Sequence, residues 1–137
     1  MEKRIKICAS WFYMIALLSL AFSWFYLSGN DLRYIAGLGM TRIADNILKY
    51  SSTGTESYIL IWAFNFCAAL IFSLSGYFSM KRKSWAFITG MIIYALDGVL
   101  LMAYKEWPGF IFHIFSIIVI FYGWIALIDN KQPGSKK

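Results

Sequence analysis

Residues 58–80 read YILIWAFNFCAALIFSLSGYFSM, and after the triplet KRK at 81–83, residues 84–104 read SWAFITGMIIYALDGVLLMAY. Asp97 is the one charged residue in these two long runs. About 20 apolar residues in an α-helix cross a hydrocarbon core roughly 30 Å thick, and each run has about this length. The segment therefore predicts two transmembrane helices joined by a short basic turn.

Two further apolar runs of similar length flank this pair. In lipid, the polar groups of the backbone must be satisfied within the segment, which favours helices. The runs lack the alternation of polar and apolar residues that a membrane β-barrel requires. We therefore predict an all-α membrane protein, a four-transmembrane-helix bundle forming a single integral membrane domain over 1–137, with spans at about 7–28, 58–80, 84–104 and 109–128.

Composition supports lipid as the solvent. Of the 137 residues, 60% are hydrophobic and 15% are charged, and the mean hydropathy is +0.61. A soluble domain carries about 25% charged residues, and disordered chains have few aromatic residues, which make up 20% here. The net charge of +6 does not indicate nucleic-acid binding, because the basic residues lie between long apolar runs. Cys8 and Cys67 lie in different runs and form no redox motif.

The distribution of Lys and Arg predicts the orientation. Nine of the thirteen lie in the N-terminal segment, the 81–83 turn and the C-terminal tail. The other side would hold Arg33, Arg42, Lys49 and Lys105. By the positive-inside rule, both termini are cytoplasmic in a plasma (bacterial inner) membrane.

The N-terminal run admits a second interpretation. Basic residues followed by an apolar run and Ala21-Phe22-Ser23 are also compatible with a secretory signal peptide. The apolar run continues to Leu27, which is longer than the hydrophobic region of such peptides, and this favours a retained span. At the other end, we expect the polar tail 129–137 to be disordered.

The long outer connection, residues 29–57, contains two apolar patterns with helical spacing. The first includes Leu32, Ile35 and Ala36. The second follows Thr41, a possible N-cap, and comprises Ile43, Ala44, Ile47 and Leu48. We expect amphipathic helices that lie in the outer interface or over the mouth of the bundle. A solvated loop is the alternative.

Each span has one stripe of small and polar residues, which is typical of helix contact faces in membranes. The stripes are Ala16, Ser19, Ser23 and Tyr26; Asn65, Ala69, Ser73 and Gly76; Ala86, Gly90, Tyr94, Asp97 and Leu101; and Gly109, His113, Ser116 and Gly123. With a rise of 1.5 Å per residue, Asn65, Asp97 and His113 would lie about 6–11 Å below the outer boundary.

An ionisable residue within a span costs about 2.5–3.5 kcal/mol on insertion scales and points to a functional site. Two interpretations remain open: a polar pocket under the outer loop, or a clasp in which Asp97 and His113 hold two spans in register. For the pocket, Arg33 and Arg42 would meet an anionic headgroup. The full set of candidate ligand-binding residues is Asn65, Asp97, His113, Tyr94, Ser23, Tyr26, Trp107, Arg33 and Arg42.

The preferred functional hypothesis is non-catalytic binding of a lipid, an amphipathic small molecule or a partner helix. An alternative is a membrane enzyme in which His113, oriented by Asp97, is a general base. A third is a small transporter or channel that works as an oligomer. One His, one Asp and Cys67 are too few ligands for a typical zinc site, so no metal or cofactor is expected. The expected partners are membrane lipids, an amphipathic ligand, and a second copy or another membrane protein, but not nucleic acid.

Overall fold

The computed structural model describes residues 2–29, 38–51 and 55–130. Within these ranges the chain is helical and contains no strand, which confirms the predicted all-helical class. The five helices are α1 (Glu2–Leu27), α2 (Gly39–Ser51), α3 (Thr55–Met80), α4 (Ser84–Ala103) and α5 (Trp107–Asp129).

Four of these helices are long and apolar enough to cross a membrane, as the sequence predicted. The chain is thus a multi-pass membrane protein by the length and composition of its helices. The candidate spans are Glu2–Leu27, Glu56–Met80, Ser84–Ala103 and Trp107–Asp129. The first helix begins before the apolar run at 7–28 does, because its backbone hydrogen bonding continues through the polar residues at the N-terminus.

The short connections between α3 and α4 and between α4 and α5 have the same backbone conformation. Arg82 and Lys105 each adopt the left-handed conformation, with φ of 59°. The N–H of the following residue reaches back five residues, from Lys83 to Phe78 O at 3.0 Å and from Glu106 to Leu101 O at 2.9 Å. This pattern ends a helix and satisfies its last carbonyl groups. Both turns therefore reverse the chain within three residues or so and bring consecutive helices together.

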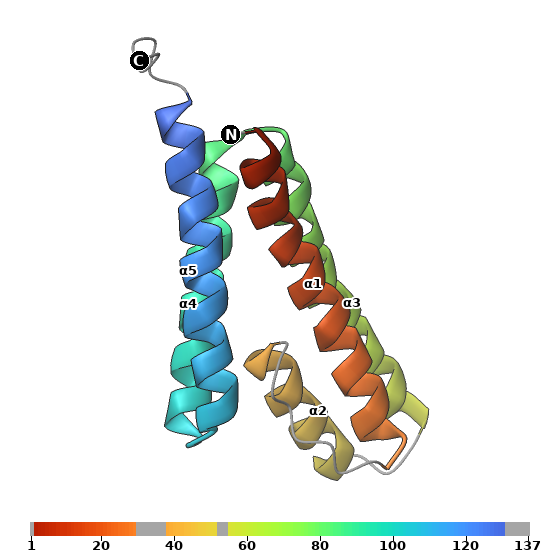
Figure 1. Cartoon of the computed structure of the whole chain (residues 1–137). Helices are drawn as coiled ribbons and strands as arrows, with labels where there is room; N and C mark the ends of the chain where they lie inside the picture. Colours follow the sequence, from red (N-terminus) through yellow and green to blue (C-terminus); the bar gives the residue numbers. More distant parts are fainter. Residues whose placement is uncertain (1, 30–37, 52–54, 131–137) are drawn as a thin grey trace.

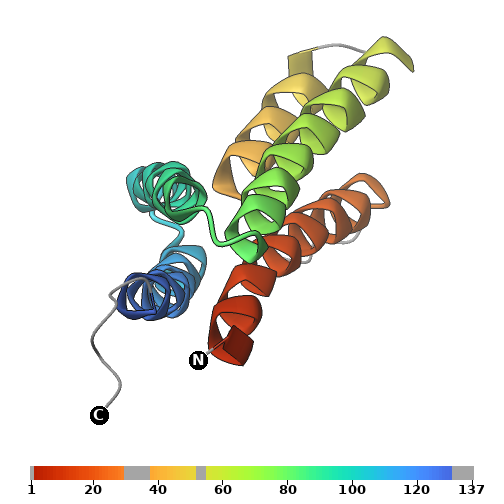
Figure 2. The ribbon, with the colours of Figure 1, turned by 90° about the horizontal axis from the view of Figure 1, so that it is seen from above.

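The helices are arranged as two antiparallel pairs, α1 with α3 and α4 with α5 (Figure 1). The pairs lie close together at the end that holds the N-terminus, and they spread apart toward the other end. α2 lies in the space between the spread ends and contacts α1, α3 and α4. From above, α2 runs alongside α3 (Figure 2).

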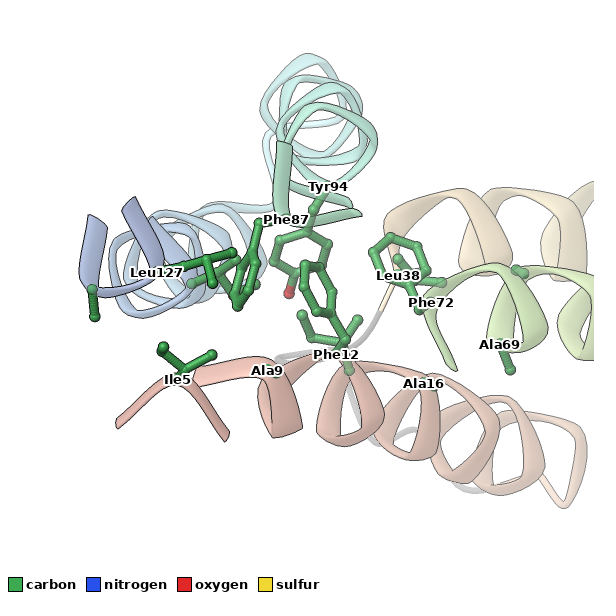
Figure 3. Packing of buried hydrophobic residues seen from close by; sticks show 14 residues of the cluster. Ile5, Ala9, Phe12, Ala16, Leu38, Ala69, Phe72, Phe87, Tyr94 and Leu127 are labelled. Atoms are coloured by element: carbon green, nitrogen blue, oxygen red, sulfur yellow. The ribbon is translucent and has the colours of Figure 1, made fainter. Parts of the chain in front are cut away.

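The two pairs meet in an aromatic core. Phe12 of α1 lies between Phe72 of α3 and Phe87 of α4, with ring centroids 6.4 and 6.2 Å away (Figure 3). Phe72 in turn makes an edge contact with Tyr94 of α4, with ring centroids 5.7 Å apart. All four rings are fully buried. This cluster fixes α1 and α3 against α4.

The predicted inner stripes face the protein interior. Ser19, Asn65, Tyr94 and His113, one from each span, are buried, while large apolar side chains on the opposite faces are exposed. At Gly90, a Cβ atom would overlap the Phe12 ring, so only glycine allows this approach of α1 to α4. Small residues therefore set the distance between the helices, as expected for packing in lipid.

α2 buries its polar side. Thr41 and Asp45 are fully buried, whereas Ile47 on the other side is 57% exposed. A helix that covers a soluble protein does the reverse and turns its apolar stripe toward the core. The predicted pattern over Leu32, Ile35 and Ala36 lies outside the described residues.

Candidate functional site

The start of α2 is held by a carboxylate from another helix. Asp97 of α4 accepts hydrogen bonds from the backbone N–H groups of Gly39 and Met40, each at 2.6 Å. The first N–H groups of a helix have no partner within the helix, and they favour a negative charge nearby. Asp97 is 2% exposed. It therefore caps α2 from α4 in a position that water barely reaches.

Gly39 makes this cap possible. A Cβ atom at this position would lie 2.6 Å from Leu101 Cγ, one turn after Asp97 on α4. A larger residue would push α2 away from α4 and lengthen the hydrogen bonds to the carboxylate. The first residue of α2 is thus fitted between Asp97 and Leu101.

His113 of α5 completes the environment of Asp97. Its Nε2 lies 2.8 Å from Asp97 Oδ2, and its Nδ1 lies 2.8 Å from Gly109 O, one turn earlier on α5. The Tyr94 ring stacks on the imidazole with centroids 4.0 Å apart and planes at 15°. His113 is 1% exposed. Both ring nitrogens are engaged, and the ring has a single well-defined orientation.

A second polar cluster joins α2 to α1 and α3. Asn65 Nδ2 of α3 donates to Asp45 Oδ1 of α2 at 2.7 Å and to Ile61 O at 2.9 Å. Ser23 Oγ of α1 lies 2.7 Å from Asp45 Oδ2 and 2.8 Å from Asn65 Oδ1. The one hydroxyl proton of Ser23 serves one of these acceptors at a time. Asp45, Asn65 and Ser23 are all fully buried.

Two further contacts run along the α1–α2 boundary. The hydroxyl groups of Ser19 and Thr41 are 3.1 Å apart, and Thr41 also donates to Leu38 O at 2.8 Å. Closer to the end of α1, the Tyr26 hydroxyl donates to Asn46 Oδ1. α2 is thus anchored along its polar side from its first residue to its middle.

The structure divides the predicted site into separate groups. Asp97, His113 and Tyr94 form one cluster, and Asn65 and Ser23 belong to the second, with α2 between them. Tyr26 contacts α2 by itself. Trp107 is 57% exposed and packs against Phe110. Arg33 and the Arg42 side chain lie outside the described residues.

Asn65, Asp97 and His113, which the sequence placed at one depth, therefore hydrogen-bond to neighbouring residues. Their partners are other side chains of the spans and groups of α2. Sequence reasoning missed Asp45 as their partner, although Thr41 and Asp45 are four residues apart and so share one face of α2.

A small pocket opens between α2, α4 and the start of α5. Its volume is about 150 Å³. Its lining residues are Ile43, Asn46, Ile47, Leu101, Tyr104 and Glu106. None of these was expected to bind a ligand. The 3–4 spacing of Ile43, Asn46 and Ile47 places them on one side of α2, but the sequence gives no sign of which helix that side meets.

In the part of the chain that the structure describes, no three His, Cys, Asp or Glu side chains cluster as metal ligands would. Cys8 is buried in α1, and Cys67 lies exposed on α3. The chemistry of the site is therefore that of hydrogen bonds, one buried imidazole and an apolar pocket.

The chain matches no known family model, and comparison with curated proteins and with solved structures gives no match. The geometry of the site is accordingly the basis for the function proposed below.

Proposed function

We propose that this protein is a non-catalytic membrane protein that binds an amphipathic small molecule or part of a lipid in the pocket between α2 and α4. The observation that carries the proposal is the pocket itself, in which apolar side chains from both helices face a space of about 150 Å³. Binding sites for small molecules are mostly apolar with a few polar groups, and here Asn46 and Glu106 supply the polar groups.

The volume limits what the pocket holds. An apolar cavity of this size accommodates a group such as a benzene ring. A single ring or a short stretch of alkyl chain would therefore enter, and the rest of the molecule would remain in the surrounding lipid. Tyr104, which is 62% exposed, lies at the rim. An amphipathic ligand suits this arrangement, with its polar end toward Asn46 and Glu106.

The proposal includes an arrangement in the membrane. The four apolar helices form a bundle with both termini on the cytoplasmic side, and α2 lies as an amphipathic element within the outer half. The excess of Lys and Arg at the end that holds the N-terminus supports this orientation. Arg42, by its place in α2, remains a candidate to meet an anionic headgroup. A second copy or another membrane protein remains a proposed partner.

The geometry favours binding over acid–base catalysis. A general base must reach the proton that it removes, directly or through one water molecule. His113 is 1% exposed, and its two nitrogens face Gly109 O and Asp97. In this conformation the imidazole has no free nitrogen to offer a substrate.

Native mass spectrometry of protein extracted in a mild detergent tests the proposal. The wild-type protein should carry one bound molecule of discrete mass. Ile47→Trp should remove that mass by filling the pocket, since Ile47 is a lining residue that is 57% exposed and tolerates a larger side chain. Ile92→Trp is the matched control, because Ile92 is 55% exposed on α4 and is not among the lining residues. A bound mass that persists in Ile47→Trp, or none in the wild-type protein, would refute pocket binding.

A further inference from the structure

The contacts of His113 determine how many protons the Asp97–His113 pair holds. Gly109 O is a carbonyl oxygen and can only accept, so the 2.8 Å contact requires a proton on Nδ1. Asp97 Oδ2, 2.8 Å from Nε2, already accepts from Gly39 N–H. A lone pair on Nε2 would face an oxygen lone pair there and be repelled. The second contact therefore also requires a proton, located between Nε2 and Oδ2.

The pair with this shared proton has no net charge, whether it is written as imidazolium with carboxylate or as imidazole with carboxylic acid. Buried ionisable groups in membranes are commonly paired in this way. No described cation contacts Asp97 apart from His113. Loss of the shared proton would thus leave an uncompensated negative charge in a buried site.

The other described titratable side chains at this end of α1, α2, α4 and α5 are Tyr26, Asp45, Tyr50, Tyr94, Tyr104, Lys105 and Glu106. α3 adds Glu56 and Tyr58, which are both exposed. Of these groups, Tyr94 touches the pair directly, through its stack on the imidazole. Asp45 belongs to the cluster with Asn65 and Ser23, and Glu106 lines the pocket.

The Asp97–His113 pair and the pocket both depend on Leu101 and on α2. Leu101 lines the pocket and also confines Gly39, whose N–H is bound by Asp97. Ile43 and Ile47, on the other wall of the pocket, belong to the helix that Asp97 caps. A change in the position of α2 at Gly39 therefore changes the distance between the two walls.

We infer that the proton shared by Asp97 and His113 holds α2 in place, so that ligand binding in the pocket is coupled to the protonation of this pair. The inference rests on the proposed function, since it concerns the regulation of that same pocket. Ligand binding would favour the pair that holds the shared proton, and by thermodynamic linkage this proton would raise affinity for the ligand by the same factor.

Loss of the shared proton and gain of a further proton both weaken the contacts that hold the N-terminus of α2. When the pair loses its proton to water, the Nε2–H bond is broken and the lone pair of Nε2 faces Oδ2. When the pair gains a further proton, Asp97 is a neutral acid beside an imidazolium, and the net positive charge of the pair then lies next to the positive N-terminus of α2. Ligand affinity should therefore pass through a maximum as pH is varied.

The test uses a lysophosphatidylcholine as the probe and native mass spectrometry of the full-length protein between about pH 5 and pH 9, which spans the range of histidine titration and beyond. Ile47→Trp, with its filled pocket, supplies the background. The ratio of the one-lipid complex to free protein should fall about tenfold from its maximum on at least one side of it, within the usual range of coupling between sites. In His113→Gln, which keeps a hydrogen-bond donor but cannot share a proton with Asp97, the profile should change: a fall on the alkaline side should disappear, and only the neutralisation of Asp97 on the acid side should remain.

Glu56→Gln is the control for the variant, because Glu56 is an exposed carboxyl group at the same end of the molecule and is not among the pocket-lining residues. It should keep the wild-type pH profile. A wild-type affinity that does not change with pH, or a profile that His113→Gln leaves intact, would overturn the coupling and leave pocket binding standing. Absence of the complex above background at every pH would instead refute pocket binding, and the coupling with it.

A second measurement covers the case in which His113→Gln does not fold. Hydrogen exchange of α2 in the wild-type protein, corrected for the intrinsic effect of pH, should show protection of Gly39 and Met40 that falls where lipid affinity falls. These two amides are the groups that Asp97 binds. Protection that stays constant while affinity changes would show that α2 is not the element that responds, and would overturn the inference.

Discussion

Asp97 makes more contacts than a typical polar residue in a membrane helix. Hydrogen bonds between membrane helices contribute about 0.6 kcal/mol on average, because the unfolded chain also finds partners in lipid. Asp97 instead accepts from two backbone N–H groups and faces an imidazole. Loss of this group would leave buried donors without an acceptor, at a cost of about 1–3 kcal/mol each. We therefore expect Asp97 to contribute more than an interhelical bond usually does.

Replacing Asp97 with Asn should lower the free energy of unfolding by about 1–3 kcal/mol, since the amide oxygen can accept from only one of Gly39 and Met40 and the NH₂ group faces the other. Unfolding by a denaturing detergent in mixed micelles, followed by circular dichroism, measures this difference. Asp129→Asn is the control, because Asp129 is exposed at the end of α5. Equal stability of the two variants would show that the cap does not stabilise the fold.

The two acidic residues of the polar clusters differ in how far the sequence reveals their partners. Asp97 and His113 lie on consecutive helices joined by a short turn, so counting residues from that turn places them at similar depth. The structure brings them within 2.8 Å. Asp45 follows a long connection, and chain length then sets no register between α2 and its neighbours. Its bond to Asn65 depends on how α2 enters the space between the helix pairs, which no local pattern encodes.

At the scale of the element, α2 turns polar residues inward and leaves the apolar residue Ile47 exposed. Its polar side meets Ser19, Ser23 and Asn65, which the spans present as hydrogen-bonding partners. Its apolar residue Ile47 is exposed, in a region where lipid is the expected neighbour. In lipid an apolar surface gains nothing from burial in protein, so hydrogen bonds decide which side faces inward.

This orientation predicts an inverted response to mutation. Asp45→Leu should destabilise the protein by about 1–3 kcal/mol, because the hydroxyl of Ser23 and the amide of Asn65 lose a buried acceptor. Ile47→Ser should change stability by less than about 0.5 kcal/mol, as at other exposed positions. Detergent-induced unfolding of the two variants provides the comparison. A larger loss for Ile47→Ser would place the apolar side of α2 inward.

The long helices were predicted from the sequence because each is determined locally, by an apolar run that begins and ends with polar residues. The short turns are equally local. Arg82 and Lys105 adopt the left-handed conformation there, at positions that glycine more often occupies. The exception is the first helix, which begins at the polar residue Glu2, before its apolar run; Arg82, distant in sequence, donates to Glu2 Oε1 at 2.7 Å there.

For the whole molecule, the arrangement predicts which turn faces which side of the membrane. In a Cys8→Ser, Cys67→Ser background, an impermeant maleimide added to intact cells should label Tyr104→Cys, in the turn near α2. Lys83→Cys, in the basic turn, should react only after permeabilisation. Both positions are exposed in the structure. Labelling of Lys83→Cys in intact cells, with Tyr104→Cys protected, would reverse the proposed orientation.

The cap on α2 also bears on the order in which the molecule assembles during synthesis. Gly39 leaves the ribosome 58 residues before Asp97, the residue that binds its N–H group. His113 follows still later. Until α4 and α5 have been inserted, α2 has partners on α1 and α3, but the N–H groups of Gly39 and Met40 have no carboxylate to bind. We expect a nascent chain arrested before Asp97 to expose α2 to proteases, and the completed chain to protect it only once its last helix has entered the bilayer.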